Sequence, residues 1–244
     1  MKLAVEKLEA GYQGKTVVKD VSFMVEKGEF ISLIGPSGCG KSTVLKVLAG
    51  LLEPMAGTIM VDDAPLQGGS RHFSYMPQSD LLLDWYDILD NVCLYGKIHG
   101  KKKEAQQQAL ENLKEFGLAG YEHAYPSQLS GGMRQRAAFL RTALCDSDIL
   151  LLDEPFGALD VITREDMQDW LNRMRQRLDR TTLLVTHDID EAIYLSDRIL
   201  ILGQRPATIT RIVDVRHPHK DRTWLYAQGE LRAAIHQELS HEVL

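Results

Sequence analysis

A string of eight residues, GPSGCGKS at 35–42, follows the apolar segment FISLI and precedes the amphipathic segment TVLKVLAGLL. It fits the pattern G-x-x-x-x-G-K-[ST], in which a glycine-rich turn between a strand and a helix closes around phosphate groups. Glycine is needed in this turn because side chains would obstruct a backbone that points several N–H groups at one anion. The string therefore predicts a strand, a phosphate-binding loop and a helix in that order, as at the start of an α/β fold.

The same loop also supplies charge and a metal ligand. Lys41 adds a full positive charge, and the amino end of the following helix adds a partial one. The Ser42 hydroxyl is placed to bind the magnesium ion that accompanies a nucleotide. We therefore expect a nucleotide with Mg²⁺ to be held by Gly35, Pro36, Ser37, Gly38, Cys39, Gly40, Lys41, Ser42 and Thr43.

Two acidic residues end a second apolar run, ILLLDEP at 149–155. Such a run is typical of a central parallel strand, whose carboxyl end faces the ligand in α/β folds. Because neighbouring strand residues point to opposite faces, Asp153 and Glu154 can divide two tasks. One would hold magnesium, and the other would reach the water that attacks the γ-phosphate. The alternative is a solvated acidic pair at a strand exit.

Two further segments could meet a phosphate. His187 ends the apolar run TTLLVTH, and a histidine there can donate to a phosphate oxygen near neutral pH. Ser130 is placed to cap a helix whose first turn holds Gly131 and Gly132, which leaves bare N–H groups for an anion. Taken alone, the histidine indicates little, and the glycines could mark a flexible helix start.

The rest of the chain is typical of one α/β unit with a helical insertion. Strand-like segments come first, a helical region with charged faces follows, and strands then alternate with helices as in a parallel sheet with crossovers. We expect a single domain over 1–244, with a catalytic core of about 1–88 and 146–220, a helical subdomain of about 89–145, and a C-terminal segment of about 221–244 containing an amphipathic helix from Trp224 to Leu239.

Composition excludes several classes of function. The net charge of −6 gives no overall positive field, so we expect no nucleic-acid partner. The three cysteines lie far apart and form neither a zinc-site spacing nor a disulfide framework, which suits a reducing cytosol. Glu6 and Glu9 interrupt the apolar stretch that a signal peptide would need, so we expect no export signal. No window approaches the roughly 18 to 20 apolar residues of a membrane-crossing helix. If the protein acts at a membrane, another chain must hold it there.

In their order, these motifs resemble the nucleotide-binding domain of ABC transporters over essentially the whole chain. The matching elements are Tyr12 in GYQGK, the phosphate-binding loop, Gln78 in YMPQSD, the LSGGMRQR signature at 129–136, LLLDEPFGALD with Asp160, and VTHD with His187. The resemblance implies a P-loop NTPase fold of the ABC type. Such a fold has an N-terminal antiparallel β region, a mostly parallel core sheet and an inserted helical subdomain.

The resemblance also implies a role for each matching residue toward ATP and Mg²⁺. Tyr12 would stack on adenine, and Ser42, Gln78 and Asp153 would organise magnesium. Glu154 would orient the attacking water, with Gln78 and His187 as the other catalytic residues. The remaining nucleotide contacts would come from the Asp160 loop and from Ser130, Gly131 and Gly132, which would grip the γ-phosphate of a nucleotide bound to a second copy.

Because each motif occurs once, the head-to-tail sandwich of this family requires two copies of the chain. The segment LLLDWYDIL, after Gln78, corresponds to the place where the family docks a membrane-embedded permease, and core aromatics are the alternative reading. The chain would then lie peripherally on the cytoplasmic face of the cell membrane. A solute-binding protein would be an indirect partner.

The segments QSDLLLDWYDILDNV and VTHDIDEAIYLSDRILILGQRPATI resemble importers for nitrate, sulfonates, taurine, bicarbonate and similar small solutes. The resemblance therefore implies an energy-coupling ATPase of an importer. One alternative is a soluble ABC ATPase serving a cytosolic assembly such as iron-sulfur cluster biogenesis. A nucleotide-binding module without turnover is disfavoured by Glu154 and His187.

Overall fold

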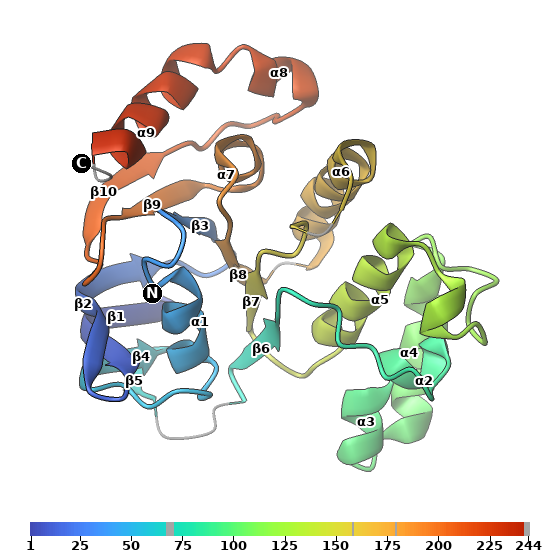
Figure 1. Cartoon of the computed structure of the whole chain (residues 1–244). Helices are drawn as coiled ribbons and strands as arrows, with labels where there is room; N and C mark the ends of the chain where they lie inside the picture. Colours follow the sequence, from blue (N-terminus) through green and yellow to red (C-terminus); the bar gives the residue numbers. More distant parts are fainter. Residues whose placement is uncertain (67–70, 158, 179, 242–244) are drawn as a thin grey trace.

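The computed structural model describes residues 1–66, 71–157, 159–178 and 180–241. An antiparallel sheet at the amino end packs beside a larger, mostly parallel sheet (Figure 1). The first sheet has the order β2-β1-β4-β5 and contains β1 (Leu3–Tyr12), β2 (Lys15–Val25), β4 (Ala56–Val61) and β5 (Ala64–Pro65). Its antiparallel pairing confirms the expected N-terminal β region.

The larger sheet has the order β10-β9-β3-β8-β7-β6. Its strands are β3 (Phe30–Ile34), β6 (Phe73–Met76), β7 (Ile149–Asp153), β8 (Thr181–Val185), β9 (Arg198–Leu202) and β10 (Ile209–Asp214). Only β10 pairs antiparallel, which confirms the predicted mostly parallel core sheet. Every residue of β3, β7 and β8 is buried, as expected for central strands covered on both faces. The strand β6 was not among the segments that the sequence predicted.

Hydrophobic packing covers both faces of this sheet. Along β3, Ile31 and Leu33 belong to one apolar cluster, whereas Phe30 and Ile34 belong to the other. This alternation follows from the two-residue period of a strand. One cluster includes α1 (Lys41–Leu48) and the antiparallel sheet, and the other includes α7 (Ile189–Leu195) and the helical region. The sheet therefore forms the middle layer that positions everything attached to its edges.

The predicted helical region stands to one side of the sheet (Figure 1). It contains α2 (Ile88–Val92), α3 (Leu94–Ile98), α4 (Lys102–Leu113), a 3₁₀ turn (Pro126–Gln128) and α5 (Gly131–Ala143). Three rings join this region to α6 (Val161–Leu178): Trp170 meets Phe116 edge-on at 4.7 Å and Phe139 at 5.2 Å between ring centroids. Such edge-to-face pairs add stability beyond the area that they bury.

The carboxyl end differs from the prediction of one helix over Trp224 to Leu239. The chain instead forms α8 (Arg222–Tyr226) and α9 (Gly229–His241). The Asp221 carboxylate caps α8 by accepting from the Trp224 N–H at 2.7 Å, and the helix ends at Ala227. Gly229, a poor residue for a helix interior, then begins a second helix instead of continuing the first. An ion pair from Arg232 to Asp190 attaches α9 to α7.

In the part of the chain that the structure describes, no helix combines the length and the apolar character needed to cross a membrane.

Candidate active site

Three adjacent strands deliver the predicted site residues to one edge of the sheet. In the order β3-β8-β7, Leu33 lies beside Val185, and Val185 lies beside Asp153. All three strands are parallel, so the segments that follow them emerge at the same edge. These segments are the phosphate-binding loop after β3, His187 after β8, and Glu154 after β7. The structure therefore brings together residues that are about 150 positions apart in the sequence.

The phosphate-binding loop depends on backbone conformations that favour glycine. Gly38 and Gly40 have φ angles of 76° and 128°. A Cβ atom at Gly40 would lie 2.5 Å from Val18 Cγ1, so a larger residue would also clash with β2. The loop then leads directly into α1. Its backbone can thus wrap closely around an anion at the amino end of a helix.

Lys41 lies across the mouth of this loop. Its Nζ donates to the carbonyl oxygens of Gly35 at 2.9 Å and Pro36 at 3.0 Å, and the residue is buried. Among the described residues, the structure pairs Lys41 with no carboxylate. A buried ammonium with carbonyl partners alone favours an incoming anion, since burial without a counter-charge is costly.

Two side-chain oxygen atoms that could bind a metal ion lie next to each other beside the loop. The Ser42 hydroxyl donates to Asp153 Oδ1 at 2.8 Å, and Asp153 itself is buried. The other carboxylate oxygen of Asp153 accepts from the Tyr75 hydroxyl at 2.9 Å. A hydroxyl and a carboxylate are the oxygen ligands that Mg²⁺ prefers, so this pair fits the expected metal.

Tyr75 was missed by the sequence analysis. Burial raises the pKa of Tyr75, and the Asp153 carboxylate raises it further, so its hydroxyl stays protonated and available to donate. The only local sequence signal for such a role is that Tyr75 stands three residues before Gln78. It belongs to the apolar segment FSYM, which forms β6. Because β6 pairs with β7, Tyr75 lies one strand away from the acidic strand end.

Of the three predicted catalytic residues, Gln78 and His187 both approach one carboxylate oxygen of Glu154. Gln78 Nε2 donates to Glu154 Oε2 at 3.0 Å, and His187 Nδ1 lies 3.5 Å from the same atom. Glu154 has a φ angle of 46°, and its N–H donates to Val185 O at 2.9 Å. A non-glycine residue in this left-handed region carries strain, which is common at functional sites.

Tyr12 and Asp160 stand at the end of β1 and just before α6, respectively. Tyr12 ends β1 with an exposed ring, as a stacking residue requires. Asp160 caps the start of α6, where it accepts from the Thr163 N–H at 3.1 Å and from the Thr163 hydroxyl at 2.7 Å. These hydrogen bonds hold the pKa of Asp160 below its ordinary value. The carboxylate is therefore charged at neutral pH.

Within one chain, the signature segment lies near Asp160 but away from the phosphate-binding loop (Figure 1). Ser130 caps α5 by accepting from the Met133 N–H at 3.3 Å. A Cβ at Gly132 would lie 2.6 Å from Thr163 Cγ2, so the glycine lets α5 approach the start of α6. Helix α5 and the loop before α1 lie on opposite sides of β7 (Figure 1). A nucleotide in the loop of one chain is consequently out of reach of its own signature.

The segment after Gln78 is tied to the signature helix. The guanidinium of Arg141 donates to the carbonyl oxygens of Asp80 at 2.5 Å and Leu81 at 2.7 Å. Arg134, which lies in the signature, donates to the Asp80 carboxylate at 3.1 Å. The sequence analysis did not predict these contacts, since they join residues more than fifty positions apart.

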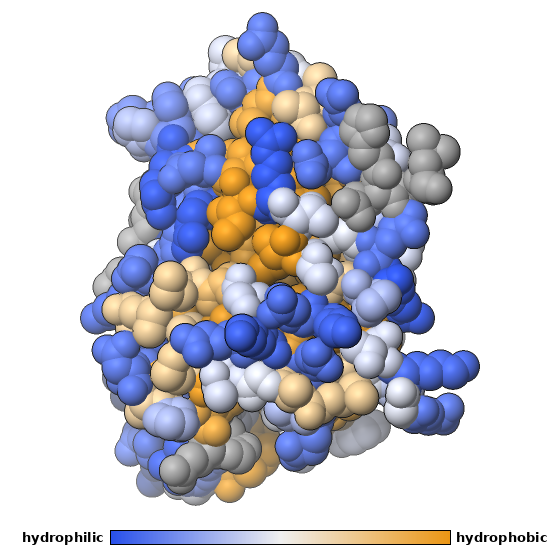
Figure 2. All heavy atoms as spheres, turned by 90° about the vertical axis from the view of Figure 1, so that its left-hand side faces the viewer, coloured by the Kyte–Doolittle hydropathy of each residue, from blue (hydrophilic) through white to orange (hydrophobic). Residues whose placement is uncertain are grey.

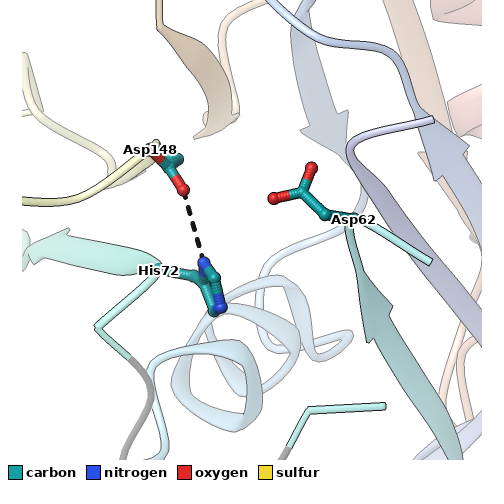
Figure 3. Close-up of side chains that lie close together, drawn as sticks. All are labelled: Asp62, His72 and Asp148. Carbon is teal, nitrogen blue, oxygen red and sulfur yellow. Dashed lines mark hydrogen bonds and ion pairs between the residues drawn. The ribbon is translucent and has the colours of Figure 1, made fainter. Parts of the chain in front are cut away.

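A second titratable cluster lies at the opposite, amino end of β7. Figure 3 shows Asp62, His72 and Asp148 turned toward one another. Lys2 Nζ lies 2.6 Å from Asp62 and 3.0 Å from Asp148, and His72 Nδ1 lies 3.3 Å from Asp148. The Lys2 ammonium already supplies the positive charge that a metal ion would bring. We therefore interpret the cluster as an ion-pair network that joins the two sheets.

Comparison with known proteins agrees with this geometry. The family model for ABC transporters matches residues 18–157. The taurine import ATP-binding protein TauB of Yersinia pestis is 41% identical over 96% of this chain and 90% of its own length. The aliphatic sulfonates import ATP-binding protein SsuB 1 of Rhodococcus jostii is 49% identical over 85% of this chain and 80% of its own length.

Solved structures show the same fold. A dimeric, post-hydrolysis state of the ATP-binding cassette MJ0796 bound to ADP and Pi superposes with a TM-score of 0.74. It is 28% identical and covers 88% of this chain and 99% of that one. A second dimeric structure of this cassette, described as a bacterial ABC transporter cassette, also gives 0.74. With its phosphate-binding loop, acidic strand end and signature in the family's order, the chain belongs to the ABC transporter family as an ATP-binding subunit.

Proposed function

We propose that this chain is the ATP-hydrolysing subunit that powers an importer of sulfonated or related small organic solutes. The observation that carries this proposal is the convergence of Gln78 and His187 on the Glu154 carboxylate beside a phosphate-binding loop. A module that only bound nucleotide would not need a carboxylate so placed. The names of the relatives support the solute class, because they import taurine and aliphatic sulfonates.

The loop would bind the phosphates of ATP when Lys41 exchanges its present hydrogen-bond partners for phosphate oxygens. Lys41 would leave the carbonyl oxygens of Gly35 and Pro36 and turn toward the β- and γ-phosphates. Backbone N–H groups from Ser37 to Thr43 would bind the remaining phosphate oxygens at the amino end of α1. Tyr12 would stack on the adenine ring from its exposed place at the end of β1.

Magnesium would be held by Ser42 and Asp153, whose oxygen atoms already lie 2.8 Å apart, with Gln78 nearby. When bound, the ion neutralises the negative charge that develops on the phosphate oxygens. Tyr75 would keep the Asp153 carboxylate in place by donating to the oxygen that faces away from Ser42.

Hydrolysis would use Glu154 as the group that orients water. Glu154 Oε2 would accept a hydrogen bond from the water molecule that attacks the γ-phosphate, in place of its present bond from Gln78. His187 would then donate to a γ-phosphate oxygen. The competition between Gln78 and water for the same oxygen links catalysis to the position of the segment after β6.

A second copy of the chain would complete the site. Ser130, Gly131 and Gly132 lie away from their own phosphate-binding loop, but their N–H groups can grip the γ-phosphate of a nucleotide held by a partner (Figure 1). The dimeric cassette MJ0796 bound to ADP and Pi supports such an arrangement. Loss of the γ-phosphate would remove the contact shared by both copies and let them separate.

The membrane partner would dock on the segment after Gln78. Trp85 is 70% exposed and Leu81 is 60% exposed, so neither is one of the core residues of the alternative reading. Asn91 binds this segment by donating to Leu83 O and Tyr86 O at 3.1 and 3.0 Å. This exposed apolar pair is suited to a permease at the cytoplasmic face of the membrane, and the permease would receive solute from a binding protein.

The proposal is tested with Glu154→Gln. The variant keeps the loop contacts to phosphate but loses the carboxylate, so we expect ATP binding within about twofold of the parent and turnover lowered by about 10²- to 10⁴-fold. A dimer should accumulate with Mg-ATP. Glu111→Gln, an exposed substitution on α4, serves as the matched control. An undiminished hydrolysis rate would reject this role of Glu154, and co-purification of a permease tests the importer assignment.

A further inference from the structure

Two large apolar side chains stand exposed at the start of α6. Val161 is 70% exposed and Ile162 is 75% exposed, and they directly follow Asp160. Adjacent, nearly fully exposed apolar side chains on a surface often mark an interaction site. The next residue, Thr163, packs against Gly132 of the signature. The exposed pair therefore lies beside the segment that is expected to face a second copy.

A partly apolar pocket lies beside the phosphate-binding loop. It has a volume of about 520 Å³ and lies between three parts of the chain. Its walls are Gly35 and Pro36 of the loop, His187 and Ile189 just before and at the start of α7, and His236, Leu239 and Ser240 on α9. Figure 2 looks onto the face that carries the carboxyl end of α9 and shows apolar side chains gathered in a hollow.

Helix α9 forms the outer wall of this pocket, and ion pairs fix its place. Arg232 pairs with Asp190 on α7, and Glu238 lies 3.5 Å from Arg211 on β10. Ile235 anchors the same helix in the hydrophobic core. The pocket is thus a preformed feature that needs no rearrangement of the last helix to receive an apolar group.

We infer that Val161 and Ile162 of one copy enter this pocket of the other copy. The inference rests on the proposed sandwich, in which the signature of one copy faces the phosphate-binding loop of its partner. Residues beside the signature then face residues beside the partner's loop, and this places the exposed pair opposite the pocket. Twofold symmetry repeats the contact, so each copy supplies one apolar pair and one pocket.

This contact would give α9 a part in closing the dimer. Leu239 would pack against the incoming apolar pair, and the pocket also contains His187, which is expected to touch the γ-phosphate. Seating of the partner's side chains would therefore depend on the same region that senses the nucleotide. The nucleotide and the apolar contact would each favour the closed dimer.

The first test places Ile162→Asp in a Glu154→Gln parent, which should hold the ATP-bound dimer. The variant would lose the apolar contact with Ile189 and Leu239 and bring a carboxylate into a partly apolar pocket, so we expect the dimer dissociation constant with Mg-ATP to rise by at least about tenfold. ATP binding to the monomer should stay unchanged, since Ile162 is exposed in one chain. Leu110→Asp, at an exposed position on α4, is the control and should dimerise like the parent.

An unchanged dissociation constant for Ile162→Asp would overturn the inference while leaving the sandwich intact. A Glu154→Gln parent that stays monomeric with Mg-ATP would instead reject the sandwich and, with it, this contact. The two failures are distinguishable because the first appears only in the Ile162→Asp variant. Sedimentation velocity measures both.

The second test locates the contact by cross-linking. One preparation carries Ile162→Cys and the other carries His236→Cys, each in the Glu154→Gln parent with the half-buried Cys145 replaced by serine. We expect a covalent dimer from a short bifunctional maleimide only when the two are mixed with Mg-ATP. Lack of a mixed product, under conditions where the dimer forms, would place Ile162 elsewhere and overturn the inference.

Discussion

At the scale of single residues, the site is defined by groups that compete for a few oxygen atoms. Glu154 Oε2 receives Gln78 and faces His187, and the two oxygens of Asp153 receive Ser42 and Tyr75. An incoming nucleotide, its magnesium ion or a water molecule can replace the contacts of Gln78 and Ser42, whereas Tyr75 keeps its bond to Asp153. The resting chain thus keeps its catalytic groups hydrogen-bonded, which avoids the cost of burying them without partners.

Glu191 is a buried acid next to this site that the proposed mechanism does not use. It is 3% exposed, and its Oε1 atom has no hydrogen-bond partner in the described part of the chain. Burial, and after it the neighbouring Asp188 carboxylate, together raise the pKa of Glu191 from 4.5 to about 8. Between pH 4.5 and about 8, the Glu191 carboxylate therefore takes up a proton when the chain folds.

From this shift we predict the pH dependence of stability. A folded pKa above the unfolded one means that the folded chain binds more protons, so Glu191 makes stability fall as pH rises from about 4.5 to about 8. Glu191→Gln cannot ionise and should raise the melting temperature more at pH 8 than at pH 5.5, by roughly 2–4 °C for each kcal/mol relieved. Melting curves at the two values check this. An equal effect at both would contradict it.

At the scale of elements, the contact between α5 and α6 joins the signature to Asp160. Gly132 makes this contact possible because a Cβ there would lie 2.6 Å from Thr163 Cγ2. The same two helices are connected to the rest of the helical region through Phe139 and Trp170. Packing against α6 therefore helps to hold the signature, in addition to the bonds of Arg134 and Arg141 to the segment after Gln78.

Gly132→Ala should disturb this packing. Adding a methyl group to a filled contact costs about 1–3 kcal/mol, so the melting temperature should fall by roughly 2–4 °C for each kcal/mol. Adding Thr163→Ser removes the opposing methyl group and should recover most of the loss, because the hydroxyl that bonds Asp160 remains. Thermal melts of the single and double variants check the pairing. Additive losses would show that the two residues do not clash.

At the scale of the whole molecule, the two sheets contribute to one hydrophobic cluster, and ion pairs near the amino end of β7 also join them. Lys2 begins this connection before β1, and its Nζ bridges Asp62 in the first sheet's turn and Asp148 before β7. The two carboxylates raise the pKa of Lys2 against the effect of its burial, and Lys2 lowers the pKa of Asp148. The network lies at the opposite end of β7 from the candidate active site.

Lys2→Met should therefore weaken the fold without changing nucleotide binding. The carboxylates are about half exposed, so we expect a loss of only about 1 kcal/mol, or roughly 2–4 °C in melting temperature. Lys103→Met, at an exposed lysine on α4, is the matched control and should melt like the parent. Thermal melts and an ATP-binding titration check both statements. A large loss of ATP affinity would contradict the separation of the network from the site.

Much of the fold could be predicted because its signals are local. The glycine-rich loop between FISLI and α1, the apolar run before Asp153, and the cap at Ser130 each need only a few neighbouring residues to be recognised. Parallel strands then deliver their carboxyl ends to one edge, so the motif order alone predicts that Lys41, Glu154 and His187 meet.

Only the tertiary structure decided the contacts between residues far apart in the sequence, because local sequence patterns do not specify them. The bond from Tyr75 to Asp153 joins positions 78 apart, and it depends on β6 lying beside β7. The pocket between Pro36 and Leu239 likewise depends on how α9 packs on α7. Residue order determined which chemical groups are present and at which strand ends they emerge. Long-range packing decided which of them touch, because contact energies depend on distance in space and not on separation along the chain.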